Sequence, residues 1–101
     1  MKSKLLNECC RLFDVHPRDL TSDARFAFLT RPRFALYKAL YMRGWSRGEI
    51  GRLIGGRDHS TVCHGLKRAE YLMGVDPDFA ANVHTLAAMR SDDIIEEVTD
   101  D

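Results

Sequence analysis

The chain has 101 residues, of which 45% are hydrophobic and 30% charged, and this is the length and composition of one compact domain. It has no run of eighteen apolar residues and no apolar core near its N-terminus, so we expect neither a membrane span nor a signal peptide. Three cysteines, an odd number, are typical of reduced thiols and indicate a cytoplasmic protein.

Charge is distributed unevenly along the chain. Residues 1–70 hold fourteen Lys and Arg against seven Asp and Glu, whereas residues 71–101 hold one against eight. A basic surface on a small domain favours a polyanionic partner, nucleic acid first, although an ordinary solvated surface explains the charge equally well. We expect a domain at residues 1–90, followed at 91–101 by an acidic, disordered tail without helical periodicity.

Apolar residues recur at helical spacing along almost the whole chain, which predicts an all-α fold. The first helix should end before Pro17, where one short turn follows. Residues 21–30 fit either a loop or the approach to the next helix. Pro32 should begin that helix, because the missing N–H of proline costs nothing in a first turn, and Gly44 should end it.

Two further helices separated by a tight glycine turn predict a helix-turn-helix. Ser46 and Glu49 have the spacing of a capping box, and Gly55-Gly56 follows this short helix as a stop. Asp58 can cap the longer second helix, which should end at Gly74. A last helix should follow from Asp76-Pro77, and the inward positions of the longer helix are Val62, Gly65, Ala69 and Leu72.

The start of the longer helix carries polar side chains of the kind that read base edges: Arg57, Asp58, His59, Ser60 and Thr61. The N-terminal end of a recognition helix enters the major groove of DNA, and its free amides favour phosphate. Lys67 and Arg68 are candidates for backbone contacts, and His64 for the edge of the groove. An ordinary helical hairpin with a polar cap is the alternative at this point.

The run GGRDHSTVCH at 55–64 resembles the signature of the DNA-binding domain of DnaA, the bacterial replication initiator, in which the string is close to GGRDHTTVLHA. EIGRLI at 49–54, RPR at 31–33 and LFDVHPRDL at 12–20 resemble other parts of that domain, so the resemblance covers about residues 3–90. It implies a Trp-repressor-like bundle of about five helices. Such a domain binds a short A·T-rich box, similar to TTATNCACA, in double-stranded DNA.

The resemblance also implies roles for single residues. Arg31 matches an arginine that enters the minor groove, while the major-groove readers of the family are matched by Asp58, His59 and Ser60. Asp can accept a hydrogen bond from a cytosine amino group, and an arginine suits a narrow minor groove. The remaining candidate DNA contacts, near the backbone or a groove, are Arg33, Arg57, Thr61, His64, Lys67 and Arg68.

The chain departs from the family pattern in several places. It has no Gly-Lys-Ser/Thr phosphate loop, so ATP-driven assembly and origin melting are not implied. Ser60 replaces a threonine, which removes a methyl group that could pack against thymine. SDARFAFLT replaces a strongly basic segment. We expect its Phe26, Phe28 and Leu29 to be core residues, with a patch for a partner as the alternative.

The sequence gives little support for a metal site or a catalytic site. His59 and Cys63 share a helical face, but the sequence offers no further pair of ligands, and the acid, imidazole and hydroxyl at 58–60 point about 100° apart. Tyr37, Tyr41 and Trp45 are expected in or beside the core rather than as a base-stacking platform. We therefore predict no catalytic residue, metal or cofactor.

These patterns together predict a sequence-specific double-stranded DNA-binding protein of a bacterial or phage cytoplasm, associated with the nucleoid. It would regulate replication initiation or transcription without ATPase activity. The alternative is an adaptor that retains the fold and binds another protein through SDARFAFLT or the acidic tail. The resident replication initiator is a candidate partner, and the oligomeric state stays open.

Overall fold

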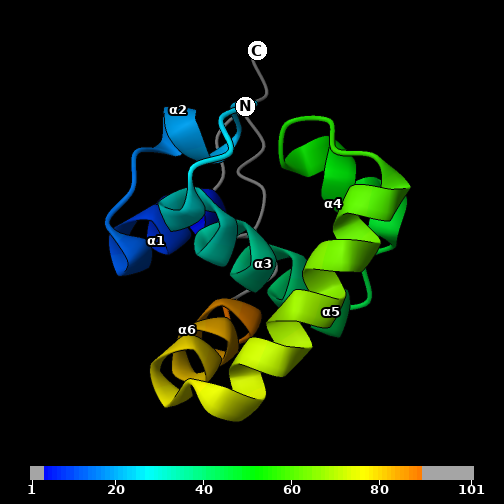
Figure 1. Cartoon of the computed structure of the whole chain (residues 1–101). Coiled ribbons are helices and arrows are strands. Elements are labelled where there is room, and N and C mark those ends of the chain that lie inside the picture. The colour runs from blue at the N-terminus through cyan, green and yellow to red at the C-terminus, as the bar shows by residue number, and fades with distance from the viewer. Residues whose placement is uncertain (1–3, 90–101) are drawn as a thin grey trace.

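The computed structural model describes residues 4–89, and within that range it contains six α-helices and no strand (Figure 1). The predicted all-α fold is confirmed. The candidate tail at 91–101 lies outside the described residues. The helices in chain order are α1 (Lys4–Phe13), α2 (Pro17–Leu20), α3 (Ala27–Met42), α4 (Arg47–Leu53), α5 (His59–Val75) and α6 (Pro77–Ala87).

Helix α3 runs through the middle of the bundle and packs against each of the other five helices (Figure 1). Its apolar stripe is fully buried at Leu36, Ala39 and Leu40, as the spacing predicts. One continuous cluster joins these residues to apolar side chains of all the other helices. Burying such a stripe is the main source of helical stability, because isolated helices of this length are marginal in water.

The start of α3 differs from the prediction. The helix begins at Ala27, so Pro32 lies inside it and the expectation that proline opens the helix is wrong. Residues 21–26 are loop, and 27–30 are the first turn of the helix. Leu29 is fully buried, and its burial holds this turn against the rest of the bundle. A proline so close to a helix start interrupts only the first internal hydrogen bonds, and tertiary packing outweighs that loss.

The helix-turn-helix forms as predicted from α4 and α5. Ser46 and Glu49 make the reciprocal capping box, and Gly55 and Gly56 end α4 with positive φ angles of 81° and 75°. The turn is tight: the Arg57 amide donates to the Gly51 carbonyl at 2.8 Å. A Cβ atom at Gly51 would lie 2.1 Å from the Arg57 carbonyl oxygen, so only glycine fits there.

Helix α5 packs closely against α3, and its C-terminal end is followed directly by α6. Its predicted inward residues are all buried, and Gly65 sits where a Cβ atom would approach Tyr37 Cδ2 to 2.3 Å. The helix continues one residue past Gly74, to Val75. Asp76 then caps α6 by accepting hydrogen bonds from the amides of Asp78 and Phe79.

Candidate nucleic-acid interface

The first turn of α5 presents a row of exposed polar side chains. Asp58 Oδ1 accepts a hydrogen bond from the Thr61 amide at 2.8 Å, which closes the helix N-terminus. That backbone hydrogen bond lowers the pKa of Asp58, so its carboxyl group is ionised at neutral pH. His59, Ser60 and Thr61 are exposed around it. The structure thus brings together four of the predicted DNA contacts at one helix end.

The exposed face of α5 continues away from this turn. At about 100° per residue, Ser60, His64 and Lys67 fall on the side opposite the buried stripe, and all three are exposed. The His64 ring meets Phe34 edge-on, with the ring centroids 6.3 Å apart. The Arg68 guanidinium lies over the Tyr71 ring at 5.4 Å. The helix therefore carries a polar and basic strip about three turns long.

His59 has a preferred orientation within this strip. Its Nδ1 lies 3.5 Å from the Cys63 sulfur, one turn along the helix, within hydrogen-bonding range. The residue is exposed, and its second ring nitrogen, Nε2, can donate or accept a hydrogen bond. Among residues 4–89, no three His, Cys, Asp or Glu side chains converge in a group that could hold a metal ion.

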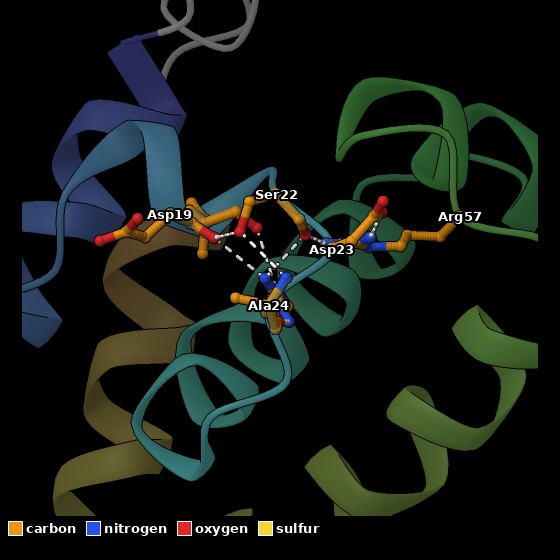
Figure 2. Close-up of polar contacts among 7 residues, drawn as sticks. Asp19, Ser22, Asp23, Ala24 and Arg57 are labelled. Atoms are coloured by element: carbon orange, nitrogen blue, oxygen red, sulfur yellow. Dashed lines mark hydrogen bonds and ion pairs between the residues drawn. The ribbon is translucent and has the colours of Figure 1, made fainter.

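Arg57 turns back toward the protein instead of outward. Its Nη2 donates to the Ser22 carbonyl, and its Nη1 lies 3.5 Å from Asp23 Oδ1. Only 13% of its side chain is exposed. Figure 2 shows Arg57 reaching across to the loop that joins α2 to α3. Arg57 therefore ties that loop to the start of α5.

Arg33, one of the candidate DNA contacts predicted from the sequence, is buried, with 6% of its surface exposed. Its guanidinium donates four hydrogen bonds to main-chain carbonyls, two in the last turn of α2 and two in the loop that follows it. Burial lowers its pKa, but an arginine stays protonated in proteins. Its donors are committed to folding the loop, through the carbonyl oxygens of Asp19, Leu20, Ser22 and Ala24.

Arg31 lies apart from the other candidates. Its Nη1 is 2.6 Å from Asp76 Oδ2, and its guanidinium lies 5.9 Å from the Phe79 ring centroid. Asp76 follows the last residue of α5, and the seventeen residues of that helix span about 25 Å at 1.5 Å each. The structure therefore does not bring Arg31 to the surface that carries His59.

The apolar residues of the segment SDARFAFLT are partly buried and partly exposed in the structure. Leu29 is in the core as expected, but Phe26 and Phe28 are 62% and 58% exposed, so the expectation of core packing is wrong for both. Their rings stack on each other, with centroids 5.6 Å apart. Leu29 is the one fully buried residue of this first turn of α3, and Phe28 beside it faces solvent.

Two arginines with exposed or half-exposed side chains, Arg25 and Arg47, were not among the candidate DNA contacts predicted from the sequence. Arg25 is exposed on the loop that Arg33 and Arg57 hold. Its signal in the sequence is that it is the one cation of the segment SDARFAFLT. Arg47 begins α4, and its guanidinium lies 5.1 Å from the ring centroid of Tyr41. Tyr41 was expected near the core but is 41% exposed, whereas Tyr37 is buried and Trp45 packs against the core as predicted.

The capped short helix, the glycine turn and the longer helix with an exposed polar start define a helix-turn-helix domain of the DNA-binding class. Residues 3–69 match the family model described as the bacterial DnaA protein helix-turn-helix. The chain belongs to this family, as its GGRDHSTVCH run predicts. Among residues 4–89, no helix is long and apolar enough to cross a membrane.

Curated relatives agree with the family match. The chromosomal replication initiator protein DnaA of Brucella abortus is 39% identical over 83 residues, which are 81% of this chain and 17% of the relative. DnaA of a Bradyrhizobium species (strain BTAi1) is 40% identical over 83 residues, 81% of this chain and 18% of the relative. DnaA of a Wolbachia species from Brugia malayi is 34% identical over 88 residues, 86% and 19% respectively. The chain thus spans less than a fifth of the length of these relatives.

Proposed function

We propose that this domain binds double-stranded DNA at sites similar to the DnaA box, with the first turn of α5 in the major groove. The observation that carries the proposal is the exposed Asp58–Thr61 turn on a capped helix N-terminus, within a domain of the DnaA helix-turn-helix family. Free amides and the dipole of such a helix end attract phosphates of the same duplex.

Base readout in this proposal belongs to Asp58, His59 and Ser60. His59 directs Nε2 outward because Nδ1 faces Cys63, and a thiol that donates to Nδ1 leaves the ring proton on Nε2. That nitrogen then donates to a base acceptor. The ionised Asp58 uses Oδ1 for the cap, and Oδ2 accepts from a cytosine amino group. Ser60 points straight out from the helix, and its hydroxyl serves either kind of base edge.

Phosphate contacts follow from the exposed cations beside this turn. Lys67 and Arg68 lie further along α5, and His64 sits between them and the base-reading turn. Arg25 extends the basic surface onto the loop, which Arg57 holds next to the start of α5. Arg31 pairs with Asp76 at the far end of α5, so we place it outside the DNA contact set.

The proposed biological role is regulation of replication initiation or of transcription in a bacterial or phage-infected cytoplasm. The 101 residues contain no Gly-Lys-Ser/Thr phosphate loop. Box occupancy by these residues alone would not involve ATP hydrolysis, and it would compete with any replication initiator that recognises the same sites. The resident initiator is therefore the first protein partner, or competitor, to test.

The test is fluorescence anisotropy with a labelled duplex that contains TTATNCACA, a scrambled duplex of equal length, and salt from 50 to 300 mM. We expect tighter binding to the box duplex at every salt concentration. Affinity for both duplexes should fall steeply with salt, because counterions are released from neutralised phosphates. Equal affinity for the two duplexes throughout the series would reject sequence-specific binding.

A protein-binding adaptor is the second candidate, and the stacked, exposed Phe26 and Phe28 favour it. An exposed apolar pair at the start of a helix is typical of a contact surface for another protein. Its test is size-exclusion chromatography with the purified resident initiator. Co-elution that Phe26→Ser with Phe28→Ser abolishes, while box affinity is unchanged, would support the adaptor. Absence of co-elution for the unmodified chain would reject it for this partner.

A further inference from the structure

A cleft of about 420 Å³ opens between α3, α4 and α5, beside the base-reading turn. Its lining includes Arg47 from α4, Tyr41 from α3 and, on α5, Cys63 and Lys67. His59, Cys63 and Lys67 are spaced four residues apart, so they follow one side of α5. The cleft is therefore the immediate flank of the surface that we assign to DNA.

Arg47 is held in this cleft with an unused donor. Its guanidinium lies over Tyr41 at 5.1 Å, a cation–π contact that fixes the plane of the group. Its Nε is buried and has no hydrogen-bond partner among the described residues. A buried, unpaired N–H costs free energy, so a small shift of the Arg47 side chain that lets Nε donate to an oxygen ligand is favourable.

The charge of the cleft selects an anion. Glu70 is its one carboxylate, and Lys38 pairs with it. That hydrogen bond lowers the pKa of Glu70, which keeps the pair ionised and mutually neutralised. Arg47 and Lys67 are the remaining cations of the lining. Planar guanidinium with a nearby ammonium is a strong combination for the oxygens of a phosphoryl group.

We propose that Arg47, supported by Tyr41 and Lys67, clamps one backbone phosphate of the duplex that α5 reads. The major groove is about 12 Å wide, similar to an α-helix with its side chains, so a helix inside it has sugar-phosphate backbone on each side. The cleft lies along one side of α5 and meets that backbone. The inference rests on the proposed function, and it adds a phosphate-binding residue on α4.

The test compares Arg47→Ala with Arg52→Ala, a matched removal of an exposed arginine from the same helix. For Arg47→Ala we expect three- to tenfold weaker binding to the box and scrambled duplexes alike. The slope of log affinity against log salt should become shallower by about one, as for one lost phosphate contact. Arg47→Lys should recover part of the slope, since it keeps the charge but lacks Nε–H and the planar group. Arg52→Ala should leave both affinity and slope within error.

A second arm locates the phosphate. Neutral methylphosphonate linkages are placed one at a time along the box, and one of them should weaken the unmodified chain but have no further effect on Arg47→Ala. Circular dichroism confirms that each variant is folded. If Arg47→Ala binds box DNA with an unchanged salt slope, the clamp is overturned while the proposed function stands. If the unmodified chain does not prefer the box, the proposed function fails first.

A free anion is the remaining outcome. Inorganic phosphate is titrated into the unmodified chain and into Arg47→Ala by NMR, with the Tyr41 and Lys67 resonances observed. Saturable shifts that depend on Arg47, combined with an unchanged DNA salt slope, would overturn the backbone clamp in favour of a small-anion site. Shifts that stay linear to 50 mM, together with the shallower DNA slope, would support the clamp.

Discussion

At the scale of single residues, the arginines of this domain separate into those that hold the fold and those that face solvent. Arg33 and Arg57 donate hydrogen bonds to main-chain carbonyls at the end of α2 and in the loop that follows it. Arg25 and Arg68 are exposed instead. The number of basic residues in the sequence is therefore an upper bound on the cations that a polyanion can meet, because Arg33 and Arg57 are already paired within the fold.

His59→Ala should reduce discrimination between box and scrambled duplex by about 1–3 kcal/mol, the range for one good base-edge contact. Its removal costs no packing, because the side chain is exposed at the start of α5. Anisotropy titrations of both duplexes at fixed salt measure the ratio. The control is His84→Ala, an exposed histidine of α6, which should not change it. Unaltered discrimination in a folded His59→Ala protein would remove His59 from the base-reading set.

Arg33→Met should lower the free energy of unfolding by about 3 kcal/mol or more, since each hydrogen bond to a charged group contributes roughly 1.5–3 kcal/mol. Four carbonyl acceptors lose their donor at once. Urea unfolding followed by circular dichroism measures the loss. Arg25→Met, on the exposed part of the same loop, is the control and should stay within about 0.5 kcal/mol.

The same pair of variants separates the two roles for Arg33. Under conditions where Arg33→Met is fully folded, the salt slope of DNA binding should match that of the unmodified chain. A folded Arg33→Met protein with unchanged stability and a slope shallower by about one would instead restore Arg33 as a phosphate contact.

At the scale of elements, α5, the helix that we propose reads bases, is positioned by its contact with α3. Gly65 allows the Tyr37 ring to lie directly against the α5 backbone, and burial raises the pKa of that phenol. Capping side chains define the N-terminal ends: Ser46 caps α4, Asp58 caps α5 and Asp76 caps α6. The close crossing and the caps together orient the first turn of α5.

Gly65→Ala should destabilise the domain by about 1–3 kcal/mol, because its Cβ would approach Tyr37 Cδ2 to 2.3 Å and Cε2 to 2.5 Å. Gly74→Ala, in the same helix, is the matched control: no atom lies within 4 Å of its Cβ position. There alanine should stabilise by about 0.5–1 kcal/mol through helix propensity. Urea midpoints of the two variants should therefore move in opposite directions, and a shift in the same direction would contradict the close crossing.

At the scale of the whole molecule, several carboxylates are stabilised in their ionised form. Hydrogen bonds to backbone amides lower the pKa of Glu49, Asp58 and Asp76, and Lys38 lowers that of Glu70. A carboxyl group whose pKa is lower in the folded state contributes stability above its unfolded pKa and loses it as pH falls through the folded value. Their ordinary values are 3.8 for Asp and 4.5 for Glu.

Stability should therefore be insensitive to these groups between pH 6 and 7 and fall progressively below about pH 4.5. Urea midpoints measured from pH 7 to pH 3 test this. Asp76→Asn keeps a capping oxygen but loses the charge that Arg31 pairs with, so its curve should fall less steeply below pH 4.5. An identical acid slope for Asp76→Asn would exclude Asp76 as one of the groups responsible.

The sequence by itself determined the helices, the helix-turn-helix, the capping box and the run that places the chain in the DnaA family. These features depend on residues within about four positions of one another, so the spacing of apolar residues and the capping side chains predict them. The sequence did not predict that α3 begins at Ala27, because burial of Leu29 outweighs the local preference of Pro32 for the first turn of a helix.

Only the tertiary structure decided which polar side chains are exposed and which are paired within the fold. Arg33 and Arg31 lie in the same RPR element, yet one enters the loop network and the other pairs with Asp76, forty-five residues away. Arg47 and Tyr41 meet across the cleft between α4 and α3, and no sequence spacing encodes that contact. The physical reason is the same in both cases. An arginine side chain is long and has several N–H donors, so its partner is the carbonyl, carboxylate or aromatic ring that the packing of the helices brings within reach.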